Sequence, residues 1–371
     1  MPYRRPTKKR FSSIRLFGRF DWSILLCIFL LCGFGILMLY EASAVFAFSK
    51  YHDRLHFVRE QIRWISIGGI GMIAASLFPY KKLYNFALPL LGITIFLLIA
   101  VILIGIGDDV HGASRWLNVG ILRFQPSELA KLSLIIYLSA WFSQPQRHRL
   151  IPFLLLMATV FGLIIAQPDL GTAILVLAIA LILYFASGAP ISHAFFLLPI
   201  GVLFVLFLAI LAPYRFARLT TFINPERDPL GSSYQIRQVL ISLGSGGWFG
   251  VGLGRSLQKY GFVPEARTDS IFAIIAEELG FVGSISLLLV FSFFLLRGLR
   301  VASHAPDRFG KLLAIGIISW VGVQTAINLS AMVALLPLTG IPLPLISYGG
   351  SSLILLLVGI GILLNISRQY H

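Results

Sequence analysis

Runs of apolar residues, separated by short polar segments, occupy most of the chain. The first run extends from Trp22 to about Phe46, and nine more follow at about 62–79, 83–106, 127–143, 150–166, 170–187, 191–212, 271–296, 310–336 and 346–366. Roughly 17 to 25 apolar residues in a helix cross the hydrocarbon core of a bilayer. The pattern therefore predicts an all-α polytopic membrane protein with about ten transmembrane helices.

The spacing of the runs indicates one membrane domain. Only the segment "QPDL" separates the fifth run from the sixth, so a tight helical hairpin and a single broken helix both fit there. No linker composition and no repeat of 20–50 residues interrupts the pattern. We expect a transmembrane domain over residues 22–367, with a basic segment at 1–21 before it and a short tail at 368–371 after it.

Composition supports a bilayer as the solvent. The chain of 371 residues is 57% hydrophobic and 12% charged, with a mean hydropathy of +0.88. Soluble domains contain about 45–50% apolar and about 25% charged residues. The two cysteines, Cys27 and Cys32, lie inside the first run and do not share a helix face, so we interpret them as packing residues. The scattered histidines have no metal-site spacing.

The net charge of +15 raises the question of a nucleic-acid partner. The Lys and Arg residues lie mostly in short segments beside the apolar runs, and no basic stripe is interleaved with stacking aromatics. The tendency of positive charge to stay on the cytoplasmic side explains this distribution better. We therefore expect no nucleic-acid partner.

The same rule sets the orientation. Segment 1–21 holds seven basic residues, and the apolar run behind it is too long for a cleavable signal peptide. Placing this segment in the cytoplasm also places there the basic residues of the alternate short loops, from Lys81 to Arg368. Both termini are therefore predicted to be cytoplasmic, and a long loop at about 213–270 is predicted to face outward.

The long loop contains two segments of interest. "SSYQIRQVLISL" has its apolar residues broadly on one helical face, which fits a short amphipathic helix at the interface, a re-entrant helix or a plain connector. "GSGGWFGVGLG" follows it. Glycine-rich backbone forms flexible turns, and its amides also converge on anions, so both interpretations remain open.

The loop ends in the charged segment "PEARTDS", residues 264–270, which contains Glu265, Arg267 and Asp269. From the residues alone, Asp269 fits an N-cap in a solvated Arg–Asp pair at the start of the next helix. It also fits a functional carboxylate, because ionisable groups beside membrane spans are costly and are functional candidates by default.

Further polar clusters fall on the same predicted outer face. Glu128 and Lys131 are three residues apart and fit an internal ion pair, and Asp169 fits a helix cap. Acids accept protons from sugar hydroxyls, and cations hold pyrophosphates, although transport would explain such a polar face equally well. The clusters contain Arg115, Trp116, Arg123, Glu128 and Lys131; Gln167 and Asp169; Arg255; and Ser347 and Tyr348.

Four segments carry a resemblance to a known family. "GASRWLNVGILRFQPSELAKL", "AQPDLGT", the stretch from "NPERDPLG" to "AEELGFVG" and "PLTGIPLPLISYGGSS" follow one another in the order found in the SEDS proteins (shape, elongation, division and sporulation; FtsW, RodA and SpoVE). Together they cover about a third of the chain. "GLGRSLQKYGFVPEA" resembles the division branch, FtsW, more than the elongation branch, RodA.

The resemblance implies a peptidoglycan glycosyltransferase that polymerises lipid II, an undecaprenyl-pyrophosphate-linked disaccharide pentapeptide, at the outer face of the bacterial cytoplasmic membrane. Asp269 matches the family's essential acid and is implied to act as general base on the acceptor 4-hydroxyl, with inversion at the donor. The implied substrate-contacting residues are Arg267, Glu265, Arg123, Lys131, Trp116, Arg115, Gln167, Asp169, Arg255 and Ser347.

The resemblance also bears on cofactors and partners. A divalent cation, Mg²⁺ or Mn²⁺, between Asp269 or Glu265 and the pyrophosphate is chemically reasonable, but no closed ligand set is readable in the sequence. The implied partners are lipid II, a class B penicillin-binding protein with transpeptidase activity, and other membrane proteins of the division or elongation machinery. Two alternatives stay open, a lipid II flippase and a scaffold for the transpeptidase.

One departure from the family pattern concerns position 267. The usual His of the "PExHTD" motif is Arg267 here, and the usual Phe after the acid is Ser270. Arginine stays charged at any relevant pH, so position 267 cannot be a proton-transferring group. We expect Arg267 to hold phosphate or to pair with Asp269 and keep that carboxylate ionised.

Overall fold

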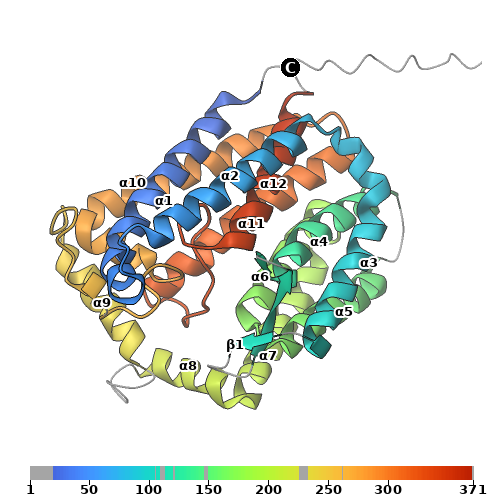
Figure 1. Ribbon diagram of the computed structural model, residues 1–371. Helices are drawn as coiled ribbons and strands as arrows, with labels where there is room; N and C mark the ends of the chain where they lie inside the picture. Colours follow the sequence, from blue (N-terminus) through green and yellow to red (C-terminus); the bar gives the residue numbers. More distant parts are fainter. Residues whose placement is uncertain are drawn as a thin grey trace, which may run out of the picture.

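The computed structural model describes residues 20–104, 106–108, 113–119, 122–145, 149–224, 233–260 and 262–369. Most of segment 1–21 and the last two residues of the 368–371 tail therefore lie outside the described residues. The described chain is a helical bundle, as the sequence predicted (Figure 1). Its helices are α1 (Trp22–Tyr51), α2 (His56–Leu77), α3 (Tyr80–Ile104), α4 (Pro126–Ser143), α5 (Leu150–Ala166), α6 (Leu170–Ala186), α7 (Ser192–Leu211), α8 (Pro213–Ile223), α9 (Tyr234–Gly246), α10 (Ile271–Ser303), α11 (Arg308–Met332) and α12 (Gly350–Ser367).

Among the described helices, six are long and apolar enough to cross a membrane, namely α1, α3, α7, α10, α11 and α12. The helices α5 and α6 are apolar but have 17 residues each. They are two helices that pack against each other, so the hairpin interpretation of "QPDL" is correct and the broken helix is wrong. The protein is an integral membrane protein, and the total of about ten spans stays a prediction.

Helices α11 and α12 lie at the centre of the bundle together with α4, most of whose residues are also buried. In the most apolar windows of α11 and α12, 67% and 72% of the residues are buried, against 6% in α7, which therefore lies at the periphery. Helix α12 packs closely on α2, because a side chain at Gly361 would come within 2.3 Å of the Met72 carbonyl oxygen. Helix α10 is bent at Gly280, whose φ of 67° is accessible to glycine at little cost.

The long segment between α7 and α10 contains short helices, as predicted. Helices α8 and α9 lie at the end of the molecule away from the C-terminus (Figure 1). A 3₁₀ turn, Gln258–Tyr260, follows α9. At the other end of the molecule, the guanidinium of Arg368 lies 4.4 Å from the ring centre of Phe20, so both ends of the described chain emerge on one side.

The connection between α3 and α4 forms a small antiparallel sheet that the sequence analysis did not predict. Its strands are β1 (Ile106–Asp108), β2 (Ala113–Val119) and β3 (Leu122–Phe124), in the order β1-β2-β3. Trp116 pairs with Ile106, and Leu117 pairs with Phe124. Runs of three to seven residues are too short for a search for membrane spans, although "RWLNV" has the aromatic and β-branched residues that favour strands.

Candidate active site

Asp269 lies in the turn directly before α10 and is 7% exposed. Its backbone carbonyl accepts a hydrogen bond from the side-chain amide of Asn328 on α11, at 2.8 Å. The N-cap position of α10 is Ser270, and no side chain caps the helix. The interpretation of Asp269 as an N-cap is therefore wrong. A buried carboxylate that does not cap its helix requires another explanation.

The electrostatic environment makes Asp269 a stronger base than a surface aspartate. Burial, and to a smaller extent the charge of Glu265, raise the pKa of Asp269, the charge of Arg218 opposes both, and the resulting pKa is about 6. A carboxyl group with this pKa is mostly ionised near pH 7 and still has appreciable proton affinity, as a general base requires.

Glu265 and Thr268 complete the turn. The Thr268 hydroxyl lies 2.8 Å from Glu265 Oε2 and 3.5 Å from Asp269 Oδ1. Glu265 has a φ of 51°, a left-handed conformation that is uncommon outside glycine, and its backbone carbonyl accepts hydrogen bonds from the amides of Thr268 and Ser270. The turn thus places an exposed carboxylate beside a buried one.

Arg218 on α8 is the cation that acts on Asp269. Its Nη1 donates to the Leu338 carbonyl at 2.9 Å. A Cβ atom at Gly340 would lie 3.9 Å from Arg218 Nη1 and 4.0 Å from Asp269 Oδ2, so both groups flank the same backbone position. The side chain of Arg218 is exposed. A buried base and an accessible cation thus lie at the same end of the bundle.

Arg267 does not pair with Asp269. Its guanidinium lies over the rings of Phe46 on α1 and Phe57 on α2, at 4.3 and 4.7 Å from their centres. Its backbone carbonyl accepts a hydrogen bond from the Tyr348 amide at 2.9 Å. The predicted pairing is therefore wrong, because aromatic side chains of two helices compete for this cation. Asp269 keeps a raised pKa instead.

Segment 333–349, between α11 and α12, is held in place by α11. Asn328 Nδ2 donates to the Ile341 carbonyl as well as to the Asp269 carbonyl, each at 2.8 Å. Gln324 Nε2 donates to the Pro342 carbonyl at 2.9 Å. Ser347 is buried, and its hydroxyl accepts from the Leu343 amide. In this structure Ser347 therefore stabilises the segment.

The "AQPDLGT" cluster meets this segment from another side. A side chain at Gly171, near the start of α6, would come within 2.7 Å of the Thr339 carbonyl oxygen. Asp169 caps α6 by accepting from the Thr172 amide at 3.1 Å, which confirms the capping interpretation. Residues of α6, α8 and α11, and of the turn before α10, therefore converge on segment 333–349.

The β-sheet adds three further predicted residues, Arg115, Trp116 and Arg123, to this end of the bundle. Arg115 Nε donates to the Gln167 carbonyl at 3.0 Å, and its Nη2 donates to the Pro168 carbonyl. The side chain of Gln167 is turned inward, where its Nε2 donates to the Leu98 carbonyl. Trp116 is half-buried on β2, and Arg123 is exposed on β3. The sheet therefore fixes the α5–α6 turn with Arg115 and exposes Arg123.

Comparison with known proteins agrees with this architecture. The family model described as "Cell cycle protein", FtsW/RodA/SpoVE, matches residues 21–371. Stage V sporulation protein E of Bacillus subtilis is 42% identical over 94% of this chain and 97% of its own length. A protein named probable peptidoglycan glycosyltransferase FtsW, from Trichlorobacter lovleyi, is 38% identical over 94% of this chain and 93% of its own.

The chain belongs to the FtsW/RodA/SpoVE family.

Solved structures of this family share the fold. RodA of Thermus thermophilus superposes with a TM-score of 0.71 at 29% identity, covering 95% of this chain and 98% of its own. A chain from a peptidoglycan synthase complex that coordinates polymerization and crosslinking superposes with a TM-score of 0.79 at 29% identity, covering 96% of this chain and 99% of its own.

Lys131 of this FtsW/RodA/SpoVE chain lies inside the bundle. Its ammonium is 2.6 Å from Glu128 Oε2, which confirms that the two residues pair, and 5.2 Å from the ring centre of Trp320. Trp320 donates to Gln324, the residue that holds the Pro342 carbonyl. A side chain that is 1% exposed reaches no substrate in this conformation, so its connection to the site runs through α11.

The glycine-rich segment is neither a flexible turn nor an anion cradle. The amides of Val251 and Gly252 donate to the carbonyls of Glu277 and Glu278, both at 3.0 Å. A side chain at Gly250 would come within 2.1 Å of the Glu278 carbonyl oxygen. The glycines therefore allow close packing of backbone against α10. Arg255 at the end of this segment is exposed.

The described residues contain no group of three or more His, Cys, Asp or Glu side chains that could hold a metal ion. Asp269 and Glu265 still fit Mg²⁺ or Mn²⁺, because such an ion is commonly bound by one or two carboxylates, with water and substrate phosphate as the other ligands. These two carboxylates would hold the ion, and it would neutralise charge on the diphosphate.

Several polar residues of the site were not found from the sequence. Arg218 and Asn328 act directly on Asp269, and Glu60 accepts a hydrogen bond from the Tyr348 hydroxyl. A separate buried network joins Glu41, Lys259, Ser256, Glu277 and Glu278. The two adjacent glutamates in "IIAEELG" could have indicated this network from the sequence, because charges inside an apolar run are rare.

Proposed function

We propose that this chain is a peptidoglycan glycosyltransferase that polymerises lipid II, with Asp269 as the general base. The observation that supports the proposal is one buried carboxylate, with a pKa of about 6, beside an exposed arginine. Relatives that are 38% identical over most of the chain bear the name of this activity. Family membership supplies the substrate class, and the local electrostatics supply the chemistry.

In the proposed reaction, Asp269 takes the proton from the 4-hydroxyl of the acceptor sugar as its oxygen attacks the anomeric carbon of the donor. A carbon–oxygen bond forms there, and the bond to the lipid diphosphate breaks with its electron pair on the leaving oxygen. Attack opposite the leaving group inverts the anomeric configuration. The guanidinium of Arg218 stabilises negative charge on the diphosphate, as preorganised cations do at developing charge.

The other predicted residues are proposed to have different roles. Arg123 and Arg255 are exposed cations that fit the diphosphate or the peptide of lipid II, and Trp116 fits a sugar face. Arg115, Gln167, Asp169 and Ser347 are proposed to support the site, because their hydrogen bonds fix its backbone. Lys131 is proposed to act through Trp320, and Arg267 through the aromatic rings of α1 and α2.

The site is proposed to face outward in the bacterial cytoplasmic membrane, with both termini in the cytoplasm. Contact between Phe20 and Arg368 supports a common side for the two termini. Helices α8 and α9 lie away from the C-terminus, which supports an opposite side for the site (Figure 1). A class B penicillin-binding protein is the proposed partner, and this is supported by the likeness to a chain of a peptidoglycan synthase complex.

The decisive experiment uses purified protein with fluorescent lipid II, with and without a class B penicillin-binding protein. Wild type should produce glycan ladders, and Asp269→Asn should produce none, because the amide keeps the shape and loses the basicity. Asp53→Asn, at an exposed ion pair with Arg59 beyond α1, is the matched control and should retain activity.

Three outcomes would contradict the proposal. Full-length ladders from Asp269→Asn would show that Asp269 is not the general base. Movement of lipid II across vesicle membranes without any ladder, unchanged in Asp269→Asn, would favour the flippase. A protein that never forms ladders, even with its partner, would be the scaffold.

A further inference from the structure

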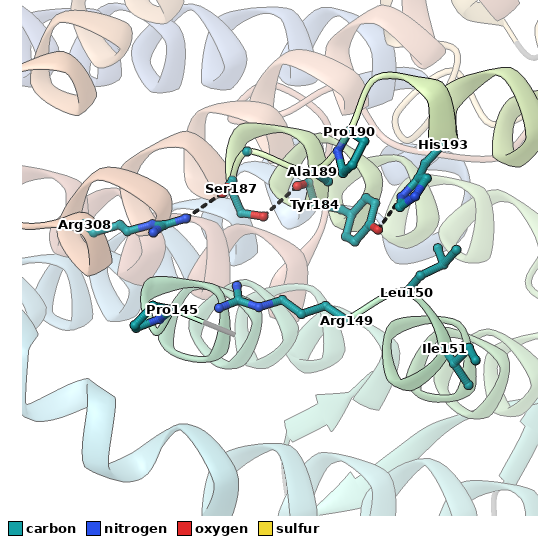
Figure 2. A pocket seen from close by; sticks show the side chains of 11 residues that line it. Pro145, Arg149, Leu150, Ile151, Tyr184, Ser187, Ala189, Pro190, His193 and Arg308 are labelled. Carbon is teal, nitrogen blue, oxygen red and sulfur yellow. Dashed lines mark hydrogen bonds between the residues drawn. The ribbon is translucent and has the colours of Figure 1, made fainter. Parts of the chain in front are cut away.

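A cavity lies at the end of the bundle remote from Asp269. Its volume is about 610 Å³, and it lies among the end of α6 and the starts of α5, α7 and α11 (Figure 2). Arg308 begins α11 at this cavity, whereas Asn328 of the same helix contacts the Asp269 carbonyl. Twenty residues of α-helix, at 1.5 Å each, separate the two sites by about 30 Å. The cavity is therefore distinct from the proposed active site.

Two arginines give the cavity its character. Figure 2 shows the side chain of Arg308 reaching Ser187, whose carbonyl accepts from Arg308 Nη2, while the side chain of Arg149 extends from another helix in the direction of Pro145. Arg149 Nη1 donates to the Phe142 carbonyl at 3.1 Å, while its Nε is buried and has no hydrogen-bond partner among the described residues. Burial and the charge of Arg308 lower the pKa of Arg149.

No acidic side chain is among the described residues that line the cavity. Asp307, adjacent to Arg308, is engaged elsewhere, because it accepts from the Tyr80 hydroxyl and the Gly310 amide and lies 3.7 Å from Lys81. Both arginines also lie at helix N-termini, where a cation opposes the helix dipole and an anion is favoured. Two like charges that act on each other at helix N-termini favour the binding of a negative group.

The surroundings of the cavity favour a lipid over a soluble anion. Ile151, which lines the cavity, is 70% exposed. Ile191 and Phe195, at the start of α7, are each 76% exposed. Helix α7 is apolar and almost entirely unburied in the bundle, so its surface is suited to contact with the acyl chains of a bilayer. The Tyr184 hydroxyl and His193 Nδ1, 2.7 Å apart, add polar groups inside the cavity, where a headgroup would lie.

We propose that this cavity binds the headgroup of an anionic glycerophospholipid from the leaflet at that end of the bundle. The two guanidinium groups hold the phosphodiester, since arginine recognises phosphate through paired N–H donors. The acyl chains lie along the exposed apolar surface of α5 and α7. Basic pockets at the ends of membrane helices bind lipid headgroups in this way. The bound lipid then joins α5, α7 and α11 at a place where the protein's own charges repel.

The test measures the melting temperature of the purified full-length chain in detergent. Phosphatidylglycerol should raise the melting temperature of wild type by several degrees more than phosphatidylcholine with the same acyl chains. The doubly substituted Arg149→Ala/Arg308→Ala chain should lose this difference. Arg149→Lys/Arg308→Lys, which keeps both charges but loses the paired N–H donors, should retain only part of it. Arg300→Ala is the matched control, because Arg300 is exposed at the same end of the bundle and outside the cavity.

Three results would overturn the proposal. The first is an unchanged preference for phosphatidylglycerol in the double alanine variant, and the second is an equal effect of the two lipids on wild type. The third is a full shift with inorganic phosphate, which would identify a soluble anion as the ligand. If the double variant does not fold, Arg308→Gln alone must lose at least about half of the difference, and failure to do so also overturns the proposal.

Discussion

Asp269 illustrates how burial and charge together set a side chain's basicity. Removing a carboxylate from water raises its pKa, and a nearby cation lowers it. Here burial has the larger effect, and Arg218 limits the rise to about 6. If a nearby cation cancelled the effect of burial completely, the carboxylate would be too weak a base. With no cation nearby, the carboxylate would be protonated at neutral pH.

The first prediction concerns the pH dependence of polymerisation. A general base must be deprotonated, so kcat/KM should be constant above pH 7 and should fall as the pH decreases through about 6, where Asp269 takes up its proton. Initial rates of lipid II consumption between pH 5 and 8 provide the measurement. An activity that stays constant down to pH 5 would contradict this assignment.

The second prediction concerns Arg218. Removing its charge in Arg218→Ala should raise the midpoint of the pH profile, because this cation lowers the pKa of Asp269. Loss of one charge contact to the diphosphate should also reduce kcat by about tenfold or more, equivalent to about 1.4 kcal/mol. Arg218→Lys should recover part of both effects. Arg54→Ala, an exposed arginine in the α1–α2 connection, should change neither, and a shift in its profile would point to long-range charge effects instead.

At the scale of elements, α11 organises the site although it carries no proposed catalytic group. Asn328 holds the carbonyls of Asp269 and Ile341, and Gln324 holds that of Pro342. These bonds position the start of α10 and segment 333–349 relative to one buried helix. The kink of α10 at Gly280 also helps to position this helix, because the backbones of Gly280 and Gly250 pack against each other.

The third prediction tests this packing. Gly250→Ala places a Cβ atom 2.1 Å from the Glu278 carbonyl oxygen at a φ of 78°, so the segment must separate from α10. We expect a loss of about 1–3 kcal/mol, as for other strained backbone positions. Thermal denaturation and the lipid II assay should both be affected. Gly244→Ala is the control, since nothing lies within 4 Å of that position, and equal stability of the two variants would contradict the packing argument.

At the scale of the whole molecule, the bundle separates two polar ends. One end contains Asp269, α8 and α9, and the other contains the cavity with Arg149 and Arg308. In the two proposals, cations at each end bind a negative group: Arg218 at the first end, and the pair of Arg149 and Arg308 at the second. The apolar middle, with α11 and α12 at its centre, keeps the two ends apart.

The fourth prediction tests the orientation of the bundle in cells. Phe249→Cys lies in the segment beside α9 and should react with a membrane-impermeant thiol reagent from outside. Ser303→Cys, at the end of α10, should react only after permeabilisation. Both positions are exposed, and the native Cys27 and Cys32 are buried and provide little background. The reverse labelling pattern would place the proposed active site in the cytoplasm.

The sequence by itself determined the features that depend on local pattern. Apolar runs of membrane-spanning length specify helices because every buried backbone group must be bonded within its own segment. For the same reason the helices appeared close to their predicted bounds. Family motifs then located Asp269. The pairing of Glu128 with Lys131 and the cap at Asp169 were also predictable, because both depend on partners three residues away in the chain.

Only the tertiary structure decided which distant residues surround Asp269. Arg218 is 51 residues before it and Asn328 is 59 residues after it, and no local pattern brings them together. The guanidinium of Arg267, two residues away in the chain, lies over the rings of Phe46 and Phe57 on other helices. A pKa likewise follows from burial and from charges across the fold. The sequence therefore determined the helices and the acid, and the packing of the helices determined what kind of acid it is.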